Sequence, residues 1–216
     1  MSDLARLSTQ LDAVTDQVPA EIGARIEAAL AEVSASGVAR GLAVGERAPE
    51  FTLPDAMGNE VSLAEHLAAG PVVLQFYRGD WCPYCNLHLR ALQAALPEIR
   101  KRGASLVAIS PQSPDHSLSL TKKAELEFDV LSDVDQHVIR AYRVQFTLPA
   151  DLQSVHLNMF DLDLRAENAD GSWNLPVPAT FVISADGRIV AAGVEADYRT
   201  RLEPSVILES LDTLVS

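Results

Sequence analysis

The sequence has few aromatic residues, only two cysteines, fewer basic than acidic residues and no long apolar run. Only 6% of its 216 residues are Phe, Trp or Tyr, so aliphatic side chains must fill most of any core. No eighteen consecutive residues are apolar, so we expect no helix that crosses a bilayer. A formal net charge of −13 disfavours nucleic acid and anionic membrane surfaces as partners.

The first thirty residues lack the features of a secretory signal. They have no basic start, no apolar stretch and no small-residue cleavage site, and they carry Asp3, Asp12 and Asp16. We therefore expect a cytoplasmic protein. In that reducing compartment, Cys82 and Cys85 are more typical of a catalytic or redox-sensing pair than of a structural disulfide.

The N-terminal segment predicts a helical arm. Between residues 3 and 36 apolar residues recur in steps of three and four, and Pro19 divides the stretch into two helices. We assign residues 1–44 to this arm, which ends in a glycine-containing linker, and residues 45–216 to the main domain. The arm is expected to pack on that domain or on a second subunit, as in a homodimer. Deleting residues 1–36 should then change solubility or assembly and leave the thiol chemistry largely intact.

The main domain alternates predicted strands and helices, which indicates an α/β fold. Residues 71–77 and 104–110 are apolar runs of strand length on either side of a helix at 86–102, so they form a βαβ unit. The remaining predictions are a hairpin near 50–63, a helix–strand–helix segment over 114–144, a hairpin over 179–193 and a closing helix over 204–215. Residues 145–177 give no clear pattern.

The chemistry is expected at the junction between the first of these strands and the helix that follows. A helix N-terminus presents free N–H groups and a partial positive charge, which stabilise a thiolate. Cys82 and Cys85 lie there, three positions apart, so their sulfurs can close a disulfide. Pro83 suits the first turn of a helix, where its missing N–H costs nothing.

Three other roles for the two cysteines can be weighed against a redox role. They could be inert core residues, although their position beside Pro83 at a strand–helix junction argues against this. They could form half of a zinc site with His88, but zinc needs a fourth ligand and no further cysteine exists. We expect His88 to lie on a solvated face of the helix instead. A c-type haem site is excluded because Asn86, and not histidine, follows Cys85. We expect neither a metal nor a cofactor.

Across residues 45–215 the chain resembles the AhpC/TSA group of peroxiredoxins, in a branch that carries C-x-x-C. The segments that carry the resemblance are GERAPEFTL at 45–53, the strand at 72–77, the Cys82/Cys85 site and VPATFVI at 177–183. The resemblance implies a thioredoxin-like fold, a central mixed sheet flanked by helices. It also implies that Pro178 forms a cis bond with Val177 and faces the cysteines. The inner pair Pro83-Tyr84 resembles glutaredoxin, and Trp81 before Cys82 resembles thioredoxin.

The sequence departs from the usual peroxiredoxin pattern P-x-x-x-T-x-x-C, in which the last cysteine attacks peroxide. Aligning that cysteine with Cys85 puts Cys82 in the place of the threonine and Arg78 in the place of the proline. The activating arginine that peroxiredoxins often carry before the T-F strand is missing. Arg78, Arg90 and Arg143 are the candidates to replace it, although from composition alone each is expected to be a surface charge. Asp80 either accepts a proton from a thiol or holds a turn. Trp81 and Tyr84, with Pro83, are expected to shape the site.

Three functions fit these residues. The first is a thiol peroxidase that reduces hydroperoxides, closes a Cys82–Cys85 disulfide and is reduced again by thioredoxin, a glutathione-type thiol or a similar donor. The second is an oxidoreductase that exchanges its dithiol with protein disulfides, with Cys82 as the exposed attacking sulfur. The third is a non-enzymatic redox sensor that meets a partner through the arm. The extent of the resemblance favours the first, with Cys85 as the attacking residue.

Overall fold

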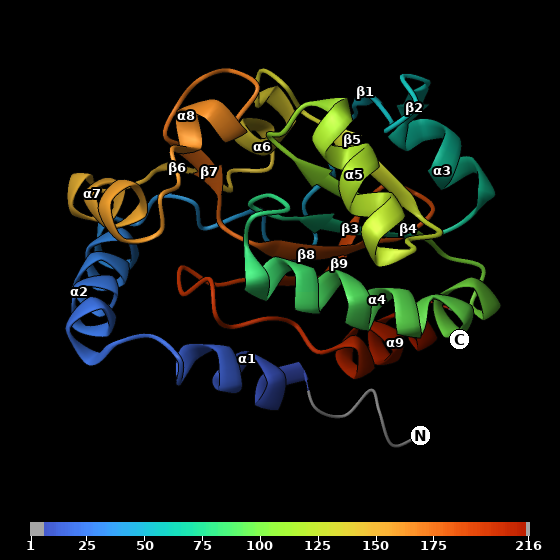
Figure 1. Cartoon of the computed structure of the whole chain (residues 1–216). Coiled ribbons are helices and arrows are strands. Elements are labelled where there is room, and N and C mark those ends of the chain that lie inside the picture. The colour runs from blue at the N-terminus through green and yellow to red at the C-terminus, as the bar shows by residue number, and fades with distance from the viewer. Residues whose placement is uncertain (1–6, 215–216) are drawn as a thin grey trace.

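A mixed five-stranded sheet forms the centre of the molecule (Figure 1). The computed structural model describes residues 7–214, apart from the side chain of Lys123. The strands lie in the order β5-β4-β3-β8-β9, with β3, β4 and β5 parallel and β8 antiparallel to both β3 and β9. Their bounds are β3 (Val72–Phe76), β4 (Ser105–Ser110), β5 (Asp129–Ser132), β8 (Ala179–Ile183) and β9 (Ile189–Val194). This sheet and its flanking helices confirm the thioredoxin-like α/β fold.

Two short antiparallel pairs lie outside the central sheet. They are β1 (Thr52–Pro54) with β2 (Glu60–Ser62), and β6 (Gln145–Thr147) with β7 (Asn174–Pro176). The helices of the described residues are α1 (Leu7–Thr15), α2 (Ala20–Ser36), α3 (Leu63–Ala69), α4 (Pro83–Lys101), α5 (Pro114–Ala124), α6 (His137–Ala141), α7 (Ala150–Met159), α8 (Leu164–Glu167) and α9 (Pro204–Asp212). None of these helices combines the length and the apolar character that a membrane crossing needs.

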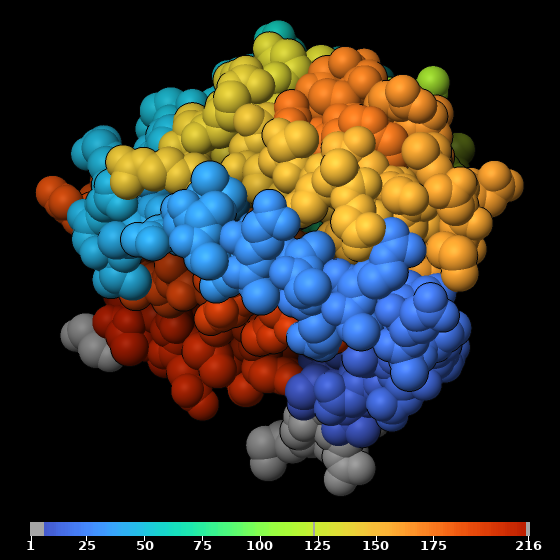
Figure 2. All heavy atoms as spheres, turned by 90° about the vertical axis from the view of Figure 1, so that its left-hand side faces the viewer, coloured from blue at the N-terminus to red at the C-terminus, as the bar shows by residue number. Residues whose placement is uncertain are grey.

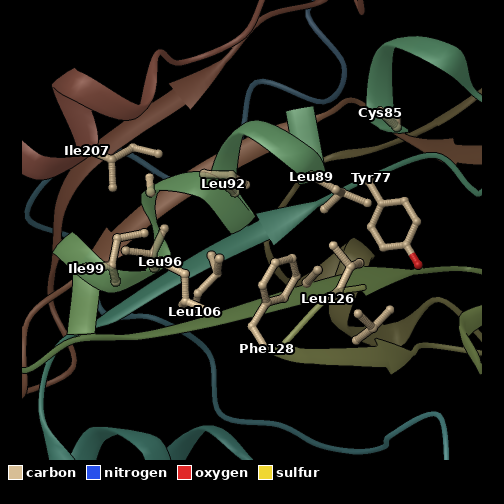
Figure 3. Close-up of a cluster of buried hydrophobic side chains, with 14 of the residues drawn as sticks. Tyr77, Cys85, Leu89, Leu92, Leu96, Ile99, Leu106, Leu126, Phe128 and Ile207 are labelled. Carbon is tan, nitrogen blue, oxygen red and sulfur yellow. The ribbon is translucent and has the colours of Figure 1, made fainter. Parts of the chain in front are cut away.

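Strand β3 is buried on both faces because its alternating side chains enter two separate clusters. Val73 faces the cluster made with α4, α9 and α1, which Figure 3 shows in part. Leu74 and Phe76 face the cluster made with α3 and α6. The continuous apolar run of the sequence is thus explained, and β3 delivers the chain to the start of α4 from a fixed position.

The N-terminal arm, α1 and α2, lies along one side of the domain, where Figure 2 shows it against the segment that holds α7 and against the C-terminal part of the chain. The two helices end and begin on either side of Pro19, as the sequence predicts. Helix α1 contacts α4, and α2 contacts α7 through a third apolar cluster that includes Ile26 and Leu152. An ion pair between Arg25 and Asp151 adds a polar contact between α2 and α7.

Residues 145–177, which give no sequence pattern, contain β6, α7, α8 and β7. Helix α7 has ten residues, a length at which isolated helices are marginal in water. Its buried residues Leu152 and Val155 pack on α2, which lies more than a hundred positions earlier in the chain. Because the stabilising contacts are non-local, the local sequence carries little of the signal.

Replacing Phe181 tests the packing of the sheet. Its side chain is fully buried and its ring contacts those of Phe76 and Tyr142. We expect Phe181→Ala to lower the free energy of unfolding by about 3–5 kcal/mol, measured by urea denaturation. The control Val44→Ala, at a residue 63% exposed, should change it by less than about 0.5 kcal/mol. Equal stability of the two variants would contradict this core assignment.

Candidate functional site

The two cysteines lie at the N-terminus of α4, directly after the loop that follows β3. Cys82 is the N-cap residue, Pro83 begins the helix and Cys85 lies in its first turn. Gly79 has φ 153°, and a Cβ on it would lie 2.4 Å from Nε1 of Trp81. A glycine is therefore required where this loop turns tightly toward the helix.

Both sulfurs are buried, with each cysteine 1% exposed. Burial by itself raises the pKa of Cys85, but the hydrogen bond from the Cys82 thiol, the charge of Arg201 and the backbone N–H and charge of Arg78 lower that pKa to about 5. Burial and the hydrogen bond to Cys85 raise the pKa of Cys82 well above its ordinary value. The arrangement holds Cys85 as a thiolate at neutral pH and Cys82 as its thiol donor. Cys82 is therefore not the exposed sulfur that the disulfide-exchange hypothesis expects.

Two arginines supply the positive charge near Cys85. Arg201, in the segment between β9 and α9, places Nη2 3.7 Å from Cys85 Sγ. Its Nη1 donates to the carbonyls of Tyr198 and Thr200, which fixes the side chain. Arg78 is 2% exposed and lies in the loop just after β3. Both cations thus lie close to one sulfur.

Arg78 is held by rings and not by a carboxylate within the part of the chain that the structure describes. Its guanidinium carbon lies 4.8 Å from the ring centroid of Trp81 and 4.3 Å from that of Tyr198. His156 Nδ1 donates to the carbonyl of Leu152, so Nε2 is free to accept from Arg78 Nη2 at 3.5 Å. Burial and the charge of Arg78 lower the pKa of His156 to about 4, so its ring is neutral at pH 7. The buried charge of Arg78 therefore has the Cys85 thiolate as its compensating partner.

A pocket of about 400 Å³ opens on Cys82; we call it the arm pocket. Val14, Val18 and Ile26 of the arm form one part of its lining. The helix α7 and the residues after it form another part, including Leu152, Val155, His156, Phe160 and Leu162. The loop and the start of α4 complete it with Arg78, Trp81, Cys82, Pro83 and Tyr84, together with Tyr198. The lining is mainly apolar, and Cys85 lies just beyond it.

The structure brings Trp81, Pro83 and Tyr84 to this pocket, as expected for residues that shape the site. The Tyr84 hydroxyl lies 3.1 Å from Thr15 Oγ1, which links the start of α4 to the arm. The arm therefore packs on the main domain, one of the two expected placements, and is part of the surroundings of the thiols. That its deletion leaves the thiol chemistry largely intact stays a prediction.

Asp80 makes its contacts away from the thiols. Its backbone N–H donates to Gln112 Oε1 at 2.7 Å, and its carboxylate accepts from Gln112 Nε2 at 2.8 Å. Of its two possible roles, these contacts fit that of holding the turn. Asp80, His116 and Glu167 form one group of possible metal ligands in the described residues, and His88 forms no such group with the two cysteines.

Arg90 and Arg143 are surface charges, as expected, whereas His88 differs from expectation. Arg90 is exposed and lines a different small pocket, and Arg143 is 63% exposed in an ion pair with Glu46. Neither replaces the missing activating arginine. His88, expected on a solvated face, is buried, and burial followed by the charge of Arg201 lowers its pKa to about 3.

The Val177–Pro178 bond is trans, so the expected cis bond is wrong. Trans is the lower-energy form of an X-Pro bond by about 0.5–1 kcal/mol, and here the bond lies in the short connection between β7 and β8. The Val177 N–H donates to the carbonyl of Val144 at 2.7 Å, which fixes this path. Pro178 lines a second pocket with Arg201 and not the arm pocket.

Sequence reasoning missed Arg201, Tyr198 and His156. Arg201 lies 116 positions beyond Cys85, in a loop without a motif, and His156 lies in the segment that gave no pattern. The one available signal was chemical: a buried thiolate needs a nearby cation, and no arginine precedes the T-F strand. This argument predicts a cation near the thiolate but does not identify the residue that provides it.

Comparisons with known proteins identify the family of the chain. The sequence pattern of the AhpC/TSA family matches residues 44–192. The chain belongs to this family. A putative peroxiredoxin of Mycobacterium tuberculosis is 30% identical over 151 residues, which cover 70% of this chain and 84% of that protein. Peroxiredoxin Bcp of Escherichia coli is 27% identical over 170 residues, 79% of this chain and 96% of that protein.

Solved structures share the fold of this AhpC/TSA chain. The peroxidoxin BcpB of Mycobacterium tuberculosis superposes with a TM-score of 0.63 at 22% identity, over 80% of this chain and 98% of that one. Peroxiredoxin Q of Xanthomonas campestris gives a TM-score of 0.60 at 23% identity, over 77% and 92%. The resemblance seen in the sequence is confirmed, as is the predicted enzyme class, an oxidoreductase of the peroxiredoxin type.

The protonation state of Cys85 can be tested by a pH titration of thiolate absorbance in the ultraviolet. The reduced protein should gain one thiolate with a midpoint near pH 5. Because Arg201 stabilises that thiolate, Arg201→Met should raise the midpoint by about 1 pH unit or more. Arg143→Met, which removes an exposed arginine with its own partner, serves as the control and should leave the midpoint in place. An Arg201→Met titration that overlays the wild type would refute the role of Arg201.

Proposed function

We propose that this protein is a thiol peroxidase that reduces hydroperoxides through a Cys82/Cys85 dithiol–disulfide cycle. One observation carries the proposal: Cys85 is a buried sulfur with a pKa of about 5, held by two arginines and a thiol donor. A thiolate beside fixed positive charge is a strong nucleophile in a site where negative charge develops on the leaving oxygen. The family membership of the chain supports the same assignment.

In the first step Cys85 attacks the terminal oxygen of a hydroperoxide ROOH. An S–O bond forms and the O–O bond breaks, which leaves Cys85 as a sulfenic acid and releases the alkoxide RO⁻. The alkoxide takes a proton from solvent water and leaves as the alcohol ROH. Arg78 and Arg201 stabilise the charge as it moves from sulfur to the leaving oxygen.

In the second step Cys82 resolves the sulfenic acid. Its thiol already donates a hydrogen bond to Cys85 Sγ, so the two sulfurs are neighbours before reaction. Cys82 loses its proton to solvent, attacks the Cys85 sulfur and displaces hydroxide, which takes up a proton and leaves as water. The protein holds a Cys82–Cys85 disulfide at the end of this step.

A thioredoxin-like or glutathione-type donor then reduces the disulfide. Cys82 lines the arm pocket and Cys85 does not, so we expect the donor thiolate to attack at Cys82. Attack at Cys82 expels Cys85, a good leaving group because its pKa is low. A second donor thiol frees Cys82. We place this cycle in the cytoplasm, where such donors are kept reduced.

The opening of the arm pocket on Cys82 also favours a second candidate, exchange with protein disulfides. In that reaction Cys82 attacks a partner disulfide and Cys85 resolves the mixed disulfide. The pKa order of the two thiols argues against this candidate, because the pocket-facing Cys82 is the protonated member of the pair.

Single substitutions separate the two candidates. We expect Cys82→Ser to react with hydrogen peroxide far faster than free cysteine does, and to accumulate a sulfenic acid at Cys85 that dimedone traps. Cys85→Ser should lose the fast reaction because burial, the largest cause of the raised pKa of Cys82, is retained in this variant. Stopped-flow Trp fluorescence and mass spectrometry measure both results.

The opposite pattern identifies the exchanger. If Cys82→Ser reacts no faster than free cysteine, and Cys85→Ser forms mixed disulfides with disulfide-bonded substrate proteins through Cys82, the peroxidase proposal is wrong.

A further inference from the structure

The arm pocket is much larger than hydrogen peroxide requires. Its volume is about 400 Å³, whereas a water molecule occupies about 30 Å³ in the liquid and drug-sized ligands occupy pockets of about 300–1,000 Å³. Hydrogen peroxide would leave most of this space unfilled. The volume fits an organic molecule of about ten heavy atoms or more.

The lining indicates an apolar occupant with one polar end. Val14, Val18 and Ile26 face the pocket from the arm, and Leu152 and Val155 face it from α7. At the chemical end the lining contains Cys82 and Arg78, whose thiol and backbone N–H bond to the Cys85 sulfur. An apolar body in the pocket therefore places an attached polar group next to Cys82 and Arg78, the two residues that hydrogen-bond the Cys85 sulfur.

Part of this wall lies outside the segment that matches the family. The AhpC/TSA pattern begins at residue 44, and the three valine and isoleucine side chains come from residues 14–26. The arm is fixed on the domain by the α2–α7 cluster and by the Arg25–Asp151 ion pair. The ion pair between Arg199 and Glu27 also joins α2 to the segment beside Tyr198, which lines the same pocket.

We propose that Val14, Val18 and Ile26 of the arm are specificity-determining residues, which bind the apolar body of an organic hydroperoxide and aim its peroxide group at Cys85. The inference rests on the proposed peroxidase function and adds to it the part of the chain that selects the substrate. Burial of the apolar body favours the organic substrate over hydrogen peroxide, which gains nothing from this wall.

Filling the pocket tests the proposal. Val18 is partly exposed and lies at the turn between α1 and α2, so a larger side chain can enter the pocket without disrupting a helix. We expect Val18→Phe to lower kcat/KM for cumene hydroperoxide about tenfold while that for hydrogen peroxide changes less than about twofold. Val44→Phe, at an exposed position outside the pocket, is the matched control. Val14→Phe repeats the test from α1 if Val18→Phe folds poorly.

Binding of cumyl alcohol, the product from cumene hydroperoxide, gives a readout that needs no turnover. The reduced wild-type protein should bind it with a change in Trp fluorescence, because Trp81 lines the pocket, and Val18→Phe should weaken that binding about tenfold. Equal effects of Val18→Phe on both hydroperoxides, or none on either, overturn the inference and leave the peroxidase function standing. If the protein binds the alcohol in the arm pocket but reduces neither hydroperoxide, the proposed peroxidase function is wrong, although the pocket does bind an apolar molecule.

Discussion

The structure depends on one electrostatic constraint, a negative sulfur buried beside positive charge at the start of α4. Burial alone opposes ionisation of Cys85, and the pair of arginines with the Cys82 thiol reverses that effect. Arg78 is itself buried without a carboxylate partner among the described residues, so each charge makes the other tolerable. Oxidation of the Cys85 thiolate therefore removes the negative charge that compensates the buried charge of Arg78.

Several distant segments meet to satisfy this constraint. Strand β3 delivers Arg78, the segment after β9 delivers Arg201, and α7 delivers His156, which accepts from Arg78. The arm closes the space on the outer side through its contacts with α4 and α7. The surroundings of the two cysteines thus come from groups spread over most of the chain.

The sequence predicts the elements whose signal is local. The apolar run before Cys82, Pro83 at the first helical position and the turn at Pro19 each specify their structure within a few residues, and the strand–helix order specifies the fold class. The resemblance, carried by short ordered segments, identified the family. These features needed no knowledge of how distant parts of the chain pack.

The features that could not be predicted from the sequence depend on tertiary packing. Helix α7 is held by the arm, so its own pattern is weak. Arg201 contacts Cys85 only because the fold brings the two together in space. Arg143 is the same type of residue, but it forms an ion pair with Glu46 on the surface. The bond at Pro178 was assigned from resemblance and is trans here. Each case shows a local property overridden by contacts between segments.

The most direct test is a residue-specific pH titration that measures the pKa of Cys82 and of Cys85 separately. Reduced protein labelled with carbon-13 at cysteine Cβ, assigned with Cys82→Ser and Cys85→Ser, reports both ionisations by NMR. The account predicts that the Cys85 signal shifts with a midpoint near pH 5 and that the Cys82 signal stays that of a thiol past pH 9. A Cys82 signal that titrates first, with Cys85 still protonated at neutral pH, would contradict it.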